Sequence, residues 1–450
     1  MKHFRWISFM MLLCVFIVSC SPSQEAGKTV SKEPVSFDSH VGEDSCEFSS
    51  LDESQASVDT LDDFPSFDPA DTPESDYILD EKFRTSEYLP QYDMQNEYTR
   101  FRTICESEEA YYFWMPHSQH LLYYDKQSGI YGKLCGKPDC THEINNMSCN
   151  ASGTFLTGLS YYDHHLYWAQ EDASDLRFRL MRMDPDGTNR ETVQVLASKA
   201  TGMNPMVRLH RGYIYTAAIQ NKVENAQNIL SLQITQEKLV SESQTSVTVF
   251  EKDYTGVGVD YYFQITGNTM YIAVTTTGPD SEMHLYLYEY DIAKRMLRQF
   301  TDERYENWLV SDFYADLSGI YVALYQDSST TYQIEKYNSA LSRFETSGEV
   351  TSSRSDLYPS LGAEVAVGYT GGNSPQYYIT DYTGHFLGEG TLPLEEGQKC
   401  MGIILFGANR SRILISYIVS VENSYLLNLF EIPVASPQSV TTLYQGTVSR

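Results

Sequence analysis

Short apolar segments, rich in aromatic residues, recur along the chain from about residue 96, and each follows a turn. Abundant aromatic and β-branched residues favour β-strands, and no long stretch shows the 3.6-residue period of an amphipathic helix. Seven anchor residues, 46 to 56 residues apart, mark the repeats: Tyr112, Tyr167, Tyr215, Tyr271, Tyr321, Val367 and Leu414. In several repeats a second segment follows, in which apolar residues alternate along the chain. It ends in Asp or Asn before another turn, as at 122–125, 180–184 and 288–291. Each repeat is therefore predicted to supply several short strands joined by tight turns.

This repeat predicts an all-β protein with the architecture of a β-propeller. The period is close to that of propeller blades, about 40 to 50 residues. A four-stranded blade cannot bury both of its faces alone, and radial packing of blades solves that problem. Seven anchors predict seven blades; six blades, or a ring closed by a strand from the other terminus, are the alternatives because the first and sixth copies are weak. A β-sandwich pair or a right-handed β-helix fits the spacing less well.

The N-terminus carries a different pattern. An apolar run from Trp6 to Val18 follows Lys2 and Arg5 and leads to Cys20. The run is too short to span a bilayer comfortably and has the flanks of a signal-peptide core. The tetrapeptide that ends at Cys20 resembles a bacterial lipobox. The resemblance implies cleavage before Cys20, a diacylglycerol on its sulfur, and a mature protein anchored on the outer side of the cytoplasmic membrane.

Acidic residues dominate the segment that follows. Residues 21–80 contain 16 Asp and Glu against Lys28 and Lys32, with many Ser, Pro and Thr. Such a segment cannot bury enough apolar surface to offset its loss of conformational entropy, so it is predicted to be a disordered tether. The predicted organisation is a lipoprotein signal peptide (1–19), the lipidated Cys20 with an acidic disordered linker (20–95), and a β-propeller (96–450).

Overall charge narrows the choice of partners. The chain has 60 acidic and 32 basic residues, a net charge of −28. Nucleic acids and anionic lipid surfaces both require Lys and Arg to neutralise phosphates, so neither is an expected partner. Tyrosine, with 35 copies, is abundant and favours strands.

A cluster of cysteines is the most distinctive chemical feature of the predicted propeller. Cys135, Cys140, His142 and Cys149 form a C-x4-C-x-H-x6-C array. Three thiolates and one imidazole suit tetrahedral zinc, and a closed set of four ligands would be structural. A disulfide is the main alternative, because exported proteins meet oxidising conditions, and free or redox-active thiols are a third.

Two segments resemble known propeller families. Leu180 to Asn189 is similar to the strand-turn signature of TolB-like propellers and of propellers of the low-density-lipoprotein-receptor type. Leu134 to His142, completed by Cys149 to Ala151, resembles a segment of propeller-bearing surface lipoproteins from Gram-positive anaerobes. With the lipobox and the repeat, the resemblance covers most of the chain, but it implies no particular reaction.

Several other residues invite a functional interpretation, but a structural one is favoured for most of them. The turn at 184–189 lacks the ligand spacing of a calcium loop and is interpreted as a hairpin turn. His164 and His165, and likewise His117 and His120, are expected in exposed turns. Among the remaining cysteines, a bridge between Cys105 and Cys400 would help to close the ring.

The sequence contains no nucleophile elbow, zincin motif, P-loop or dinucleotide fingerprint, and it names no catalytic residue. The leading functional hypothesis is therefore a lipid-anchored extracytoplasmic propeller that binds a protein, peptide or glycan of the cell envelope. A polysaccharide lyase or hydrolase on the same scaffold, and an assembly factor for envelope proteins, are the alternatives. No cofactor is expected other than the structural zinc.

Overall fold

The computed structural model describes residues 79–449, apart from 99–102, 116–117, 144–145, 147, 154–155, 173, 200–202, 225–226, 240–245, 256–257, 279–281, 327–328, 352–356 and 422. The predicted signal peptide, Cys20 and the linker up to residue 78 lie outside the described residues. In the part of the chain that is described, no helix is long and apolar enough to cross a bilayer. The first element is a short 3-10 helix, η3 (Glu81–Phe83).

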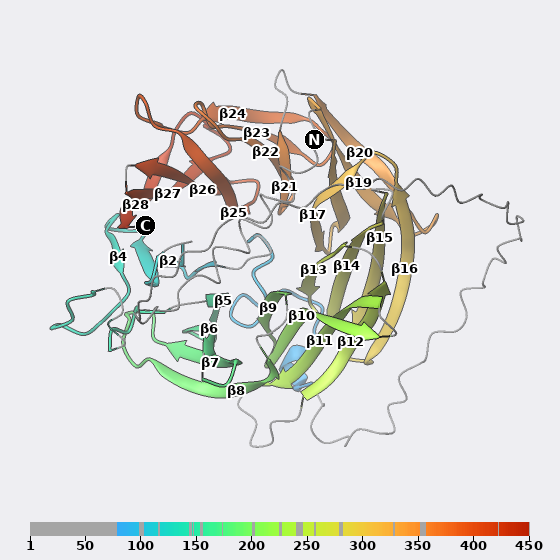
Figure 1. Cartoon of the computed structure of the whole chain (residues 1–450), viewed down its shortest axis with the longest axis horizontal. Coiled ribbons are helices and arrows are strands. Elements are labelled where there is room, and N and C mark those ends of the chain that lie inside the picture. Colours follow the sequence, from blue (N-terminus) through green and yellow to red (C-terminus); the bar gives the residue numbers. More distant parts are fainter. Residues whose placement is uncertain are drawn as a thin grey trace, which may run out of the picture. The chain divides into compact units, whose positions relative to one another are not determined.

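Strands make up nearly all of the remaining structure, in seven antiparallel sheets of four consecutive strands each (Figure 1). Blades 1 to 4 consist of β1 (Ile104–Glu106), β2 (Ala110–Phe113), β3 (Leu122–Asp125) and β4 (Tyr131–Lys133); β5 (Leu156–Tyr162), β6 (His165–Asp172), β7 (Arg177–Met183) and β8 (Glu191–Lys199); β9 (Met203–His210), β10 (Tyr213–Glu224), β11 (Gln227–Lys238) and β12 (Ser246–Thr255); β13 (Gly258–Thr266), β14 (Thr269–Thr277), β15 (Met283–Asp291) and β16 (Met296–Tyr305). Blades 5 to 7 consist of β17 (Leu309–Asp316), β18 (Gly319–Tyr325), β19 (Thr331–Asn338) and β20 (Arg343–Thr351); β21 (Tyr358–Gly362), β22 (Val365–Thr370), β23 (Gln376–Asp381) and β24 (Phe386–Thr391); β25 (Cys400–Ala408), β26 (Arg412–Val421), β27 (Ser424–Pro433) and β28 (Thr441–Ser449).

The sheets form a seven-bladed β-propeller, as the repeat predicted. Each anchor residue lies in the second strand of its blade, and the alternating segments that end in Asp or Asn are third strands. First strands lie around the centre of the ring (Figure 1), and those of most neighbouring blades contact one another. No described strand is exchanged between the first and last blades, so the alternative of closure by a strand from the other terminus is wrong.

The hydrophobic core is divided among the interfaces between blades. Buried residues of the described strands fall into seven clusters, each shared by two neighbouring blades. In β15 the buried residues up to Leu287 belong to the cluster shared with blade 5, whereas Tyr288 and Tyr290 belong to the cluster shared with blade 3. The buried side changes at Leu287/Tyr288, where the pairing with β16 shifts register. Side chains of this one strand therefore pack on both sides of its sheet, because successive residues point to opposite faces.

Polar contacts supplement the hydrophobic cluster at the seam between blade 7 and blade 1. Arg412 of β26 donates a hydrogen bond to the carboxylate of Glu106 in β1, and Lys126 Nζ lies 2.7 Å from the other oxygen of that carboxylate. Tyr98 forms a single β-bridge with Gly407. Burial alone would raise the pKa of Glu106, but the charges of Arg412 and Lys126 outweigh it, and the pKa is lowered.

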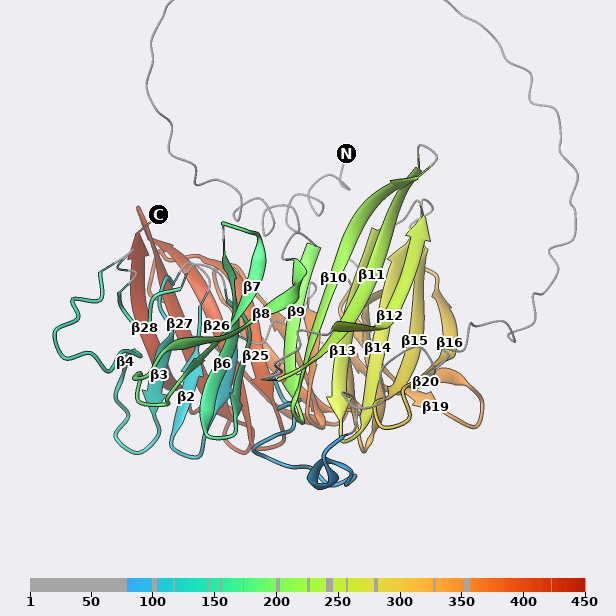
Figure 2. The same ribbon diagram turned by 90° about the horizontal axis from the view of Figure 1, so that it is seen from below.

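Residues 79–98, called the strap below, run across one face of the ring. Strap residues hydrogen-bond to Asp163, Arg211, Glu106, Ile265 and Ala408, which belong to five blades. These partners lie at or beside the turns that join first to second strands, and such turns all share one face. Figure 2 shows the strap beneath the ring. The last part of the segment predicted as a disordered linker is therefore a packed element of the body.

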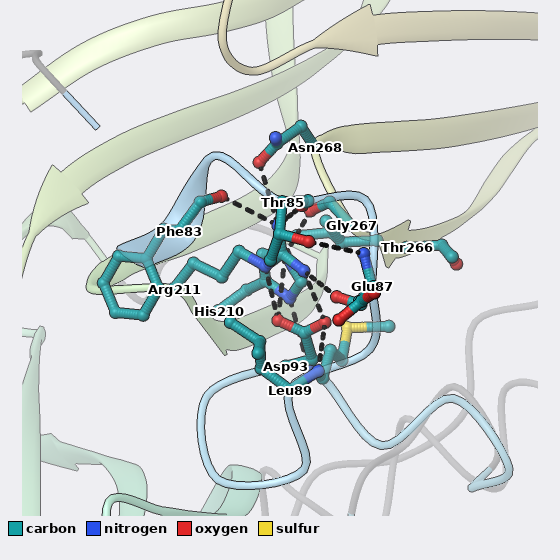
Figure 3. Close-up of polar contacts among 12 residues, drawn as sticks. Phe83, Thr85, Glu87, Leu89, Asp93, His210, Arg211, Thr266, Gly267 and Asn268 are labelled. Atoms are coloured by element: carbon teal, nitrogen blue, oxygen red, sulfur yellow. Dashed lines mark hydrogen bonds and ion pairs between the residues drawn. The ribbon is translucent and has the colours of Figure 1, made fainter. Parts of the chain in front are cut away.

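Buried polar groups hold the strap in place (Figure 3). Arg211, 1% exposed, donates from Nε and Nη2 to the two oxygens of Asp93 at 2.5 and 2.8 Å. Its remaining hydrogen bonds go to the carbonyls of Phe83, Thr85 and Glu87 and to the side chain of Asn268. The guanidinium thus ties the strap to the turns of blades 3 and 4.

Candidate metal centre

The cysteine cluster lies in the connection between blades 1 and 2. Residues 134–155 join β4 to β5, and this is longer than any other connection between blades. Blade 1 has the shortest strands of the ring, of three or four residues each. The long connection thus adjoins the blade with the least strand pairing.

The four predicted ligands converge in the structure. The Sγ atoms of Cys135, Cys140 and Cys149 and a ring nitrogen of His142 all lie within 4.8 Å of one another, and His142 Nδ1 is 3.5 Å from Cys149 Sγ. Zinc–sulfur bonds of about 2.3 Å place tetrahedral ligands about 3.8 Å apart, so small shifts would fit the four donors to one ion. All three cysteines are free thiols. The Cys3His cluster can hold a metal ion.

Backbone N–H groups near the sulfur atoms favour their thiolate forms. Burial alone would raise the pKa of Cys135, but hydrogen bonds from the backbone of Lys137 and Asn150 lower it overall. Burial raises the pKa of Cys149 to about 11, although the backbone of Ala151 opposes the change. A divalent cation would stabilise both thiolates, since metals bind cysteine in its deprotonated form.

The connection 134–155, called the metal loop below, docks against a hairpin turn of blade 2. The carbonyl of Gly187 accepts hydrogen bonds from Gly136 N at 3.0 Å and from Asn150 Nδ2 at 2.8 Å. Gly187 has a φ of +81°, and a Cβ there would lie 2.8 Å from the backbone nitrogens of Cys135 and Gly136. Only glycine fits this contact.

That hairpin turn is closed by its own side chains. Asp186 Oδ1 accepts from the backbone and hydroxyl of Thr188, and Asp184 Oδ2 accepts from Asn189. The carboxylates are thus occupied within the turn, which agrees with the interpretation as a hairpin turn. Sequence reasoning missed its second role as the platform for the metal loop, because the contact depends on a backbone carbonyl.

The other predicted residues are scattered. His164 and His165 lie at the β5–β6 turn as expected, and His165 Nε2 is 3.4 Å from Asp184. His120, expected in an exposed turn, is only 4% exposed, because Ser152 of the metal loop pairs with it; that prediction was wrong. Burial lowers the pKa of His120. His117 lies outside the described residues.

The predicted bridge between Cys105 and Cys400 is absent: neither cysteine forms a disulfide, and both are buried. Cys105 packs in the cluster between blades 1 and 2, whereas Cys400 packs in the cluster between blades 6 and 7. The prediction failed because the two strands direct these side chains away from the seam.

Comparison with known proteins bears on the fold. No protein-family model matches the chain, and no curated protein matches it. Among solved structures it is similar to an ulvan lyase bound to a GlcA-Rha3S unit (10% identity, covering 81% of this chain and 97% of that chain, TM-score 0.45). It is also similar to a periplasmic gluconolactonase of Pseudomonas aeruginosa (14%, 78% and 95%, TM-score 0.44). A third similar structure is dipeptidyl peptidase 4 of Porphyromonas gingivalis (10%, 78% and 54%, TM-score 0.39), of whose length the chain spans about half.

At these identities the similarities concern the fold alone. They assign neither a reaction nor a ligand to this chain.

Proposed function

We propose that this protein is a lipid-anchored extracytoplasmic binding module, in which a zinc-clasped propeller presents one face to a protein, peptide or glycan of the cell envelope. The anchor would be Cys20, and the acidic linker would give the propeller reach. Recognition would use the loops and aromatic side chains at one end of the ring.

The strap is the observation that supports this orientation. It occupies the turns between first and second strands, so this face, the strap face, is already bonded to the protein's own chain at five blades. The opposite face carries the long β10–β11 hairpin, which projects beyond the other strands in Figure 2. We therefore assign the ligand to the face opposite the strap.

A photo-crosslinking experiment tests this assignment. A photoreactive amino acid is placed singly at exposed apolar positions of the opposite face (Leu176, Val223) or of the strap face (Met296, Leu317). The full-length protein is then irradiated in cells. Crosslinks to one envelope component from the opposite face support the proposal. Crosslinks confined to strap-face positions contradict it, and release of shortened glycan on incubation with envelope polysaccharide would favour the lyase or hydrolase.

Anchoring has its own test. In cells fed a labelled fatty acid, the protein should carry the label and fractionate with membranes, and Cys20→Ser should lose both properties. Equal labelling of the two proteins would contradict lipidation at Cys20.

For the metal, we propose zinc as a structural ion held by Cys135, Cys140, His142 and Cys149. The thiol-rich tetrahedral donor set supports zinc, and the contacts of the loop with both blades support a structural role. Native mass spectrometry before and after chelation tests this. A mass excess of one zinc ion, lost on chelation together with a fall in melting temperature, is expected. A mass deficit of two hydrogens without metal would indicate a disulfide instead.

A further inference from the structure

Arg190 makes more hydrogen bonds to the metal loop than any other side chain whose contacts are described. Its Nη1 donates to the backbone carbonyls of Cys149, Asn150 and Ser152 at 3.2, 3.1 and 2.5 Å. Its Nη2 donates to Gln170 Oε1 at 2.8 Å. The guanidinium carbon lies 5.6 Å from the centre of the Trp168 ring. The side chain is thus fixed from several directions, although none of its atoms is a metal ligand.

The carbonyls that Arg190 contacts belong to the segment that carries one of the metal ligands. Cys149 is itself a ligand, and its carbonyl and those of Asn150 and Ser152 all accept hydrogen bonds from Arg190. Because a peptide group is planar, holding these carbonyls fixes the orientation of the peptide planes that follow Cys149. Arg190 therefore helps to set the direction in which the side chain of Cys149 leaves the backbone.

The positive charge of Arg190 also suits a position beside the metal centre. Three thiolates, a neutral imidazole and Zn²⁺ carry a net charge of −1, and an arginine keeps its positive charge in a half-buried position. Lys133 and Lys137 also donate to carbonyls of the loop, those of His142 and Ser148, but both lysines are exposed. Their charges are therefore screened by solvent, whereas that of Arg190 acts at close range.

We infer that Arg190 is the positioning residue of the metal centre, holding the peptide groups that follow Cys149 so that its sulfur faces the other three ligands. This inference rests on the proposed zinc site. Outer-shell partners of metal ligands typically contribute 10- to 100-fold to metal affinity.

The test compares full-length wild type with Arg190→Met, Arg190→Lys and a matched control, Arg179→Met. Arg179 belongs to the same blade, but its guanidinium pairs with Asp172 and Asp175. Zinc affinity is measured by competition with a chromophoric chelator. The thiolate-to-metal absorption of the Co²⁺-loaded protein reports the geometry at sulfur.

We expect zinc affinity to fall by about 10- to 100-fold in Arg190→Met, to recover only in part in Arg190→Lys, and to stay unchanged in Arg179→Met. The Co²⁺ spectrum should shift in both Arg190 variants. Methionine donates no hydrogen bond, and lysine restores the charge but cannot donate to the several carbonyls in the geometry of a guanidinium. If wild type binds zinc and the Arg190 variants match it in affinity and spectrum, the inference is wrong. If wild type binds no zinc, the proposed metal site itself fails. Circular dichroism of the proteins in chelator shows whether a loss of zinc affinity is due to unfolding. A variant that is folded in chelator but binds zinc weakly supports the inference.

Discussion

His210 beneath the strap predicts a measurable loss of stability in mild acid. Its Nδ1 accepts a hydrogen bond from the backbone N–H of Met94 at 3.0 Å, and its Nε2 is 2.7 Å from the carbonyl of Gly267, so the neutral ring with a proton on Nε2 satisfies both partners. Burial lowers the pKa of His210 from 6.5 to about 4; the charge of Asp93 opposes this effect and that of Arg211 adds to it. A second proton would remove the acceptor for Met94.

The direction and size of the effect follow from linkage. In the unfolded chain the imidazole takes up a proton near pH 6.5, whereas the folded protein resists protonation until about pH 4. The contribution to stability is therefore complete above pH 6.5 and is lost as the pH falls between these two values. From pH 7 to pH 5 the loss amounts to about 2 kcal/mol of the free energy of unfolding, and over the whole interval to about 3 kcal/mol.

Urea denaturation at pH 7 and pH 5 measures this loss. His210→Asn is the comparison, because Asn Oδ1 can still accept the N–H of Met94 but does not titrate. Wild type should lose about 2 kcal/mol more than the variant between the two pH values, since all other titrating groups are common to both proteins. Parallel stability profiles, or an NMR titration of folded wild type that places the pKa of His210 near 6.5, would refute the reasoning.

Further substitutions test the platform, the strap and the seam. Gly187→Ala should destabilise the protein more than Gly397→Ala. Both glycines have a positive φ, of +81° and +83°, but of the two only Gly397 has open space for a Cβ. In thermal melts Gly397→Ala should lower the free energy of unfolding by about 1 kcal/mol, and an equal loss for Gly187→Ala would argue against the clash. Asp93→Asn leaves the charge of Arg211 buried without its counter-ion and should lower the free energy of unfolding by about 3 to 5 kcal/mol in urea titrations. A loss below about 1 kcal/mol would show that the carbonyl groups bonded to Arg211 are enough to stabilise its charge. Arg412→Met at the seam should cost about 2 kcal/mol by the same assay, and an unchanged midpoint would mean that hydrophobic packing alone closes the ring.

The propeller was predictable because its determinants are local. Each blade repeats a turn followed by an apolar, aromatic-rich second strand, and Tyr167 and Tyr271 mark this pattern. The weaker anchors Val367 and Leu414 also lie in second strands. The convergence of the metal ligands was predictable for the same reason, because short spacings limit how far Cys135 and Cys149 can separate.

The strap and the supports of the metal loop were not predictable, because their contacts are distant in sequence and often involve the backbone. Nothing near Arg211 marks it as the partner of Asp93, which is 118 residues away. The acidic composition before residue 80 also concealed the few apolar residues of the strap, such as Phe83 and Met94, that are buried. Arg190 looks like an ordinary turn residue until the carbonyls it contacts are seen.

The bridge between Tyr98 and Gly407 has a consequence for how the chain folds. It joins one of the earliest described residues to the last blade, and Arg412 and Glu106, 306 positions apart, lie beside it. The strap is therefore synthesised before nearly all of the body, and its partners in blade 7 are synthesised last. Contacts of such long range make folding slow and late, because the entropy of closing the loop must be lost before the contacts form. A chain that stops short of blade 7 therefore lacks the partners of both Tyr98 and Glu106 at this seam.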